Sequence, residues 1–319
     1  MVSGYVGCGV PLRVQMNPVL LSLVLLLLFP LTALTQEAGT VTLLEGALRV
    51  IRGTTVLLGG EGMSLRQGDI IESSDPGFAQ LEFAGGAIAA LGPSSRLFLF
   101  SHGAGRAFAK PGGEAAATEL VLLSGWLKGE SSPSAGACRY ATPLLAATSR
   151  GGGSVLVRAA AVTEIFVESG SAAIAEVNPD GNLGQSTAAK AGQFFSRRPG
   201  RPVNTASRLD PGFVNSLPSA FRDTLPSRLA HFAGKRPTEP RRQHEVTYPE
   251  IQPWLTMAHA WRRGFVERFQ PRLSDPEFRK GVEAHLNEHP EWDRILHPEK
   301  YQPKAPPPAA TPDSRHGRQ

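Results

Sequence analysis

The sequence predicts a mainly β protein, in which stacked β-sheets, arranged as a sandwich or a solenoid-like stack, are followed by a small α-helical C-terminal region. In residues 36–200, short apolar stretches rich in Val, Leu and Ile are separated about every ten residues by glycine turns, as is typical of strands. Residues 201–319 instead contain helix-start signals. The charges divide in the same way, because residues 36–200 carry 13 basic and 14 acidic side chains and residues 201–319 carry 19 basic and 14 acidic. These observations place a boundary close to residue 200.

The first 35 residues are typical of a secretory signal. An apolar run over residues 19–29 is shorter than the roughly 20 residues that a membrane-spanning helix needs, and Pro30 ends it. We therefore expect cleavage near residue 35 and a periplasmic or secreted mature chain without a membrane span. An uncleaved anchor is the alternative, because Arg13 is the only basic residue ahead of the apolar run, and a start at Met16 instead of Met1 would leave none.

Composition excludes several classes of protein. With 41% hydrophobic residues the chain is too apolar to be wholly disordered, and its two cysteines are too few for a disulfide scaffold. Signal cleavage would remove Cys8 and leave Cys138 as the single thiol. We expect Cys138 to be buried or unreactive and to form no structural disulfide.

Apolar stretches in the first half predict individual strands. They lie at residues 41–44, 48–51, 56–58, 79–83, 88–91, 97–100, 120–123, 155–157, 164–167 and 172–177. Residues 80–83 alternate polar and apolar side chains, which places them on opposite faces of a strand. Residues 97–100 are apolar on both faces, which predicts sheets that are covered on both sides. Asp180 and Gly181 predict a tight hairpin turn.

An ordered series of short motifs runs through residues 39–198. Its main members are Gly39-Thr40-Val41, Glu45-Gly46, Gly68-Asp69-Ile70-Ile71, Gly86, Pro93-Ser94, Gly125, Thr142-Pro143, Gly170 and Ala191-Gly192-Gln193. Together they resemble the FecR domain family, which is the periplasmic sensor domain of ferric-citrate-type regulators and of many exported envelope proteins. The resemblance implies a FecR-like β domain over residues 36–200. Gly68, Asp69 and Gly86 suit turns, so the carboxylate of Asp69 is interpreted as structural.

Two features depart from that family. Its regulators carry a cytoplasmic anti-sigma segment before their membrane helix, whereas the apolar run here begins at Val19, so we expect no direct control of a sigma factor. Where relatives have the tripeptide Arg-Gly-Thr, this chain has Arg150 followed by three glycines. This difference predicts a loop that is longer or more flexible. A flexible hairpin loop is favoured there over an anion-binding nest formed by the glycines.

The second half is predicted to be helical and to end in disorder. Its segments are a helical connector at 201–233, a linker at 234–248, a small helical domain at 249–302 and a disordered tail at 303–319. Helices are predicted to start at Asp210, at Ser219 (running towards residue 232) and at Asp275. Apolar residues spaced by four predict stripes that face a core. They are Trp261, Phe265 and Phe269, and Phe278, Val282 and Leu286.

Few residues indicate chemistry. His285 and His289 have the spacing of a metal-binding helix, but they lack a third ligand and Pro290 follows, so surface histidines are favoured. No nucleophile, base and acid form a recognisable arrangement, so we predict no catalytic, metal or cofactor site and no enzyme. A basic face of the helical tail is the candidate for contact with anionic lipid head groups or cell-wall polymers. Its arginines are Arg262, Arg263, Arg268 and Arg272.

The first hypothesis is a non-enzymatic envelope protein whose β domain presents a sheet edge or a loop to a protein partner. The alternative is a module that binds an envelope polymer or lipid through these arginines of the small helical domain. Nucleic acid is not expected as a partner of an exported protein. A hidden hydrolase is the weakest hypothesis, and the resemblance to a fold family does not settle function.

Overall fold

The fold of the described residues is mainly β, as predicted. All strands of the described chain join into one hydrogen-bonded network. The computed structural model describes Met1 and residues 37–102 and 118–301. The predicted signal peptide after Met1 and the predicted disordered tail lie outside the described residues.

Every stretch predicted as a strand lies within a strand of the structure. The strands are β1 (Glu37–Glu45), β2 (Leu48–Arg52), β3 (Thr55–Leu58), β4 (Ser64–Arg66), β5 (Ile70–Ser73), β6 (Phe78–Phe83), β7 (Ala87–Leu91), β8 (Arg96–His102), β9 (Thr118–Ser131), β10 (Cys138–Ala141), β11 (Leu145–Ala159), β12 (Thr163–Val177), β13 (Leu183–Lys190), β14 (Phe194–Arg197), β15 (Asn204–Ala206) and β16 (Arg241–Glu245). The sequence does not predict β4, β5, β10 or β13 to β16, because these strands are short or rich in polar side chains.

Among the residues that the structure describes, the helices lie in the second half, as predicted. The α-helices are α2 (Pro211–Ser216), α3 (Tyr248–Leu255), α4 (His259–Arg262), α5 (Phe265–Phe269), α6 (Pro276–Ala284) and α7 (Asp293–Leu296), and the 3-10 helices are η1 (Ser219–Phe221), η2 (Leu229–Phe232), η3 (Gln270–Ser274), η4 (Pro290–Trp292) and η5 (Pro298–Tyr301). Asp210 and Asp275 cap α2 and α6 at the predicted starts. The longer helix predicted from Ser219 is wrong, because Pro226 interrupts the segment between η1 and η2. No helix in the described ranges is long and apolar enough to cross a membrane.

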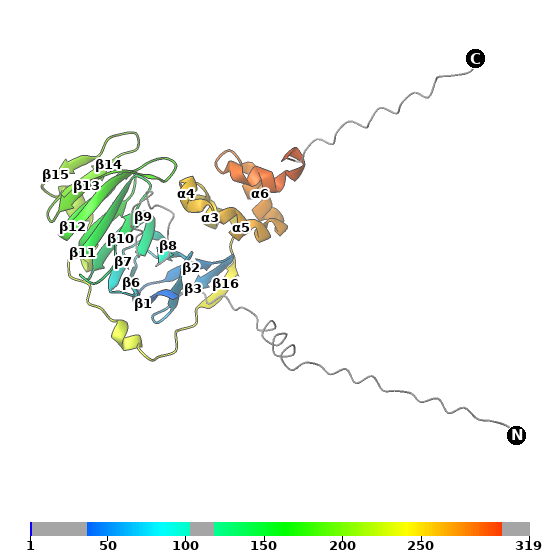
Figure 1. Ribbon diagram of the computed structural model, residues 1–319, viewed down its shortest axis with the longest axis horizontal. Helices are drawn as coiled ribbons and strands as arrows, with labels where there is room; N and C mark the ends of the chain where they lie inside the picture. Colours follow the sequence, from blue (N-terminus) through cyan, green and yellow to red (C-terminus); the bar gives the residue numbers. More distant parts are fainter. Residues whose placement is uncertain (2–36, 103–117, 302–319) are drawn as a thin grey trace, which may run out of the picture. The chain divides into compact units, whose positions relative to one another are not determined.

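The long strands β9, β11 and β12 change partners along their length. β9 pairs with β8 and, in parallel, with β10 over its first half, and with β7 and β11 over its second half. β12 pairs with β11 along its length, and its other edge pairs first with β14 and then with β13. Figure 1 shows β11 and β12 side by side. A strand that exchanges partners in this way lets one sheet bend around a core.

Alternate residues of the strands face different hydrophobic clusters. Leu97 and Leu99 of β8 belong to an inner cluster drawn mainly from the strands, whereas Phe98 between them belongs to a cluster shared with the C-terminal helices. A third cluster contains Phe213 and Phe221 of the connector, packed against other strand residues. The prediction that the sheet is covered on both faces is therefore confirmed.

The three glycines after Arg150 lie within β11, so the predicted flexible hairpin loop is wrong. All three have positive φ angles, and the register of β11 against β12 shifts between Ser149 and Gly153. A Cβ atom at Gly153 would lie 2.6 Å from the carbonyl oxygen of Ser169. The glycines therefore form a bulge where two strands approach closely.

The segment predicted as a linker, residues 234–248, contains β16. This strand pairs antiparallel with β3 and extends the sheet. The helices that follow it share a hydrophobic cluster with the strands, and the described residues 37–102 and 118–301 belong to one compact unit. The change in composition near residue 200 lies within this unit.

Candidate functional site

A short two-stranded ribbon, formed by β14 and β15, ends the sheet on one side. β14 pairs with β12, and β15 pairs antiparallel with β14, from Ser196 opposite Asn204 to Phe194 opposite Ala206. Within the described residues no strand pairs with the outer side of β15. The ribbon therefore presents an open edge, whose backbone N–H and C=O groups are available to another strand.

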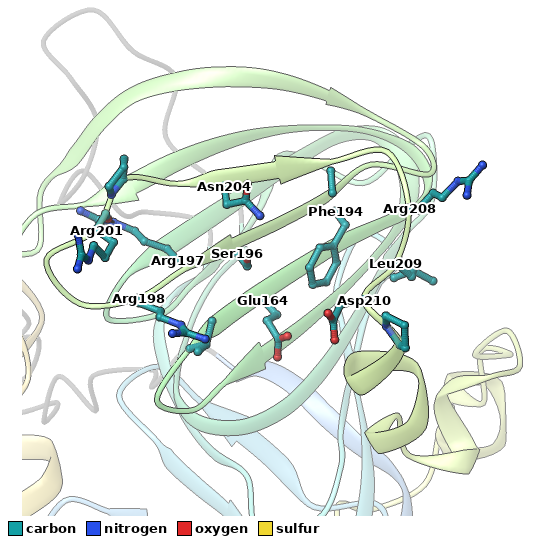
Figure 2. Close-up of a pocket in the computed structure, with 14 residues that line it drawn as sticks. Glu164, Phe194, Ser196, Arg197, Arg198, Arg201, Asn204, Arg208, Leu209 and Asp210 are labelled. Carbon is teal, nitrogen blue, oxygen red and sulfur yellow. The ribbon is translucent and has the colours of Figure 1, made fainter.

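Each face of this ribbon borders a groove, because its side chains alternate between the faces. The larger groove, of about 630 Å³, is lined by Phe194, Asn204 and Ala206 among others, and Figure 2 shows it. Phe195 and Thr205 point to the opposite face and line a second groove, of about 310 Å³, beside residues of β13.

The start of helix α2 forms one wall of the larger groove. The Asp210 carboxylate caps this helix by accepting hydrogen bonds from the backbone N–H groups of Gly212 (2.8 Å) and Phe213 (3.1 Å). The ring of Phe213 packs edge-on against Phe194, with centroids 5.3 Å apart. Cap and aromatic contact together hold the connector against the ribbon.

Arg197, at the end of β14, contributes to the structure of the ribbon. Its Nη1 atom donates to the carbonyl oxygens of Leu144 (2.8 Å) and Val177 (3.0 Å), and its Nη2 atom pairs with Glu176 at 3.0 Å. Glu176 also accepts from the backbone N–H of Val203, just before β15. These contacts fasten β15 and the preceding turn to the long strands.

Three further arginines of the groove have no partner for their guanidinium groups among the described residues. Arg198, Arg201 and Arg208 are all exposed. Figure 2 shows Arg198 and Arg201 towards the turn between β14 and β15, and Arg208 at the opposite end. Both ends of the groove therefore carry unpaired positive charge.

Two carboxylates lie between these ends. Glu164 pairs with Arg158 at 3.2 Å. Burial raises the pKa of Glu164 above its ordinary value, the charge of Arg158 opposes that rise, and the nearby charge of Asp210 adds to it. Glu164 forms an ion pair and Asp210 caps α2, so the contacts of both carboxylates are structural.

The four arginines predicted to contact anionic material lie outside this groove, in the C-terminal helices. Arg262, Arg268 and Arg272 donate to backbone carbonyl oxygens. These oxygens belong, respectively, to Leu255 and Glu288, to Ile51, Gly53 and Gly68, and to Val246. Arg263 is exposed and has no described partner. Three of the four guanidinium groups predicted to contact anionic material therefore form hydrogen bonds inside the protein.

His285 and His289 are not surface histidines on one helical face, as the sequence favoured. Helix α6 ends before His285, whose ring stacks on Tyr248 with centroids 5.3 Å apart. His289 is fully buried, and its Nε2 atom lies 3.0 Å from the Tyr248 hydroxyl. Within the described ranges no group of three or more His, Cys, Asp or Glu side chains could hold a metal ion.

Protonation of His289 should destabilise the helical region at mildly acidic pH. Burial lowers the pKa of His289 below its ordinary value of 6.5, and the charge of Arg262 lowers it further, while Glu291 and Glu288 oppose the shift. The unfolded chain therefore takes up this proton first, and stability should fall as pH decreases through about 6.5 towards the folded pKa. In chemical unfolding measured from pH 7.5 to 5.5, His289→Gln should show a weaker pH dependence than the unsubstituted chain. The exposed-site variant His231→Gln should keep the full dependence, and equal slopes for both variants would contradict the prediction.

Gly68 and Asp69 form the turn between β4 and β5. Gly68 has a φ angle of 86°, which favours glycine. The buried Asp69 carboxylate accepts from the backbone N–H of Arg66 (2.8 Å) and pairs with Arg52 at 2.6 Å. The residues thus lie in a structural turn.

The other turns singled out in the sequence also lie between strands. Gly86 has a φ angle of 86° between β6 and β7, and Gly181 one of 90° between β12 and β13. The Asp180 carboxylate accepts from the backbone N–H of Asn182 at 2.9 Å. The Asp180 carbonyl accepts from the N–H of Ala260 at 3.1 Å, so this hairpin also positions α4.

Cys138 is buried, as predicted. Burial raises the pKa of its thiol to about 11. The thiol is therefore protonated at neutral pH and is a weak nucleophile.

The arginines of the ribbon groove are not among the site residues predicted from the sequence. The local signal is that Arg197, Arg198 and Arg201 flank the Pro-Gly pair at 199–200, a typical turn. Arg208 shares no motif with them, and only the pairing of β15 with β14 brings it to the same groove.

Comparisons with solved structures find distant similarity. No family model matches the chain, and no curated protein matches it. Two crystal structures of a "putative anti-sigma factor" from Parabacteroides distasonis ATCC 8503, at 1.65 and 2.50 Å resolution, are similar with TM-scores of 0.34 and 0.33. Each has 8% identity, and the match covers 44% of this chain and 59% of the other. The chain thus spans less than two thirds of the length of these structures.

Proposed function

We propose that this chain is a non-catalytic exported protein of the cell envelope that docks a protein partner by strand addition to β15. The observation that carries the proposal is the open edge of β15 between two grooves. A strand added to this edge would gain main-chain hydrogen bonds, and its alternate side chains would enter the grooves. Export is supported by the signal-like residues 1–35.

β15 is better suited to strand addition than β16, at the other end of the sheet. β16 carries Arg241, Arg242 and Glu245, and charged side chains on an edge discourage pairing with other chains. β15 consists of the small, uncharged residues Asn204, Thr205 and Ala206. The difference favours β15 as the docking edge.

Catalysis and polymer binding have less support from the described residues. Glu164 pairs with Arg158, and Asp210 caps a helix, so both groove carboxylates have structural partners. Internal carbonyl groups occupy three of the four tail arginines predicted to bind lipid or polymer. Protein docking is therefore the function that the geometry supports best.

In-cell photo-crosslinking tests this function. A photo-reactive residue at the exposed Ser207, directly after β15, should capture a discrete protein, whereas the same residue at the exposed Lys280 should not. Thr205→Pro should abolish the adduct, because proline removes a backbone N–H and disrupts β15 whichever side that group faces. Identical adducts from both positions, or an adduct that survives Thr205→Pro in a folded protein, would overturn the proposal.

A further inference from the structure

The β14–β15 ribbon also indicates the chemistry of its partner. We infer that the groove shown in Figure 2 receives an extended segment with acidic side chains at both of its ends and an uncharged centre. The inference rests on the proposed function, because it concerns the same edge. It adds the charge pattern that selects the partner.

The ends of the groove carry the attractive charge. Arg198 and Arg201 lie near one end of β15 and Arg208 near the other, all exposed and without a described ion-pair partner. An extended segment lying along β15 would pass both ends. Acidic side chains at its two ends would then meet arginines, which suit carboxylates because guanidinium groups can donate two parallel hydrogen bonds.

The centre of the groove disfavours additional acidic residues. Glu164 and Asp210 face this part, and Figure 2 shows their carboxylates near each other. Burial raises the pKa of Glu164, its ion pair with Arg158 opposes that rise, and the charge of Asp210 adds to it. A third carboxylate beside these two would be repelled. Ala206 and Leu209, which are partly exposed, offer an apolar surface for uncharged side chains instead. The arginines at the ends therefore strengthen binding of a segment with acidic ends, and the carboxylates at the centre weaken binding of a uniformly acidic segment.

A labelled peptide tests the inference directly. The probe has the sequence Glu-Glu-Thr-Val-Thr-Val-Thr-Glu-Glu, with blocked termini, and its binding is followed by fluorescence polarisation. We expect binding that weakens as salt rises from about 50 to about 300 mM, because exposed charges are screened. The triple variant R198E/R201E/R208E should bind about tenfold more weakly or worse. A peptide with glutamate also at its central positions should bind less tightly than the probe.

The matched control reverses three exposed arginines elsewhere, as R222E/R236E/R263E, and changes the net charge by the same amount. This control should bind the probe like the unsubstituted chain. Circular dichroism checks that both variants fold. Equal binding by the two triple variants would overturn the inference.

The two proposals can fail separately. If the Ser207 adduct persists in the folded R198E/R201E/R208E variant, charge does not select the partner, and the inference falls while strand addition stands. If no adduct forms at Ser207, the docking function falls and the inference falls with it. The unsubstituted chain could instead bind vesicles with anionic head groups, lose that binding in the triple variant and fail to bind the peptide. That result would overturn the inference, because the ligand of the groove would be a lipid surface and not a protein segment.

Discussion

Replacing Arg268 with Met should release the C-terminal helices from the sheet. It should lower the free energy of unfolding by about 3–5 kcal/mol, because three carbonyl acceptors lose a charged hydrogen-bond donor. Arg268 belongs to α5, and its guanidinium group donates to the carbonyl oxygens of Gly53 (2.8 Å), Gly68 (2.6 Å) and Ile51 (2.8 Å). The same group lies 4.8 Å from the centroid of the Phe269 ring. Met fills a similar volume but leaves three carbonyl oxygens without their charged donor.

The charge of Arg268 persists at neutral pH despite burial. Burial lowers the pKa of Arg268 to about 10, and the charge of Asp69 opposes that shift.

Urea unfolding at pH 7 measures the effect of Arg268→Met. Arg263→Met removes a neighbouring exposed arginine and should change stability by no more than about 0.5 kcal/mol. Lysine at position 268 should restore only part of the loss, because one ammonium group cannot reach all three carbonyls in the same geometry. Equal unfolding midpoints for the two Met variants would contradict this role.

Replacing Lys128 with Met should detach the connector from the opposite side of the sheet, at a similar cost of about 3–5 kcal/mol. Lys128 of β9 is fully buried, and its Nζ atom donates to the carbonyl oxygens of Phe221 (3.1 Å) and Asp223 (2.8 Å). It also pairs with Glu168 at 2.9 Å and Glu130 at 3.4 Å. Its removal leaves a cluster of acceptors without a cation.

Two measurements separate this effect from a general loss of packing. Limited proteolysis should cut the Lys128→Met variant within residues 209–232 much faster than the unsubstituted chain, and Lys190→Met, at an exposed site, should behave normally. Adding Glu168→Gln should recover part of the stability, because it removes one of the stranded negative charges. Unchanged cleavage of the connector would show that Lys128 does not fasten it.

Local sequence predicted the elements whose signals are local. Residues 97–100 show apolar side chains on both faces, and the structure covers both faces. Asp210 and Asp275 accept the first backbone N–H groups of their helices at short range, so each helix start could be identified from neighbouring residues. The polar strand β13 shows no such signal, because its exposed residues form a strand only through pairing with β12.

The composition and pattern of the sequence determined that this protein is mainly β, with helices after residue 200, because strand alternation and helix capping depend on residues close together in the chain. Tertiary structure decided which charges face solvent. Arg268 and Arg198 are both arginines next to apolar or turn residues, yet one is bonded to carbonyls some 200 residues away in sequence and the other is exposed in a groove. Whether a guanidinium group is hydrogen-bonded depends on the acceptors that distant strands bring close to it. The residues next to each arginine in the sequence do not indicate which acceptors those are.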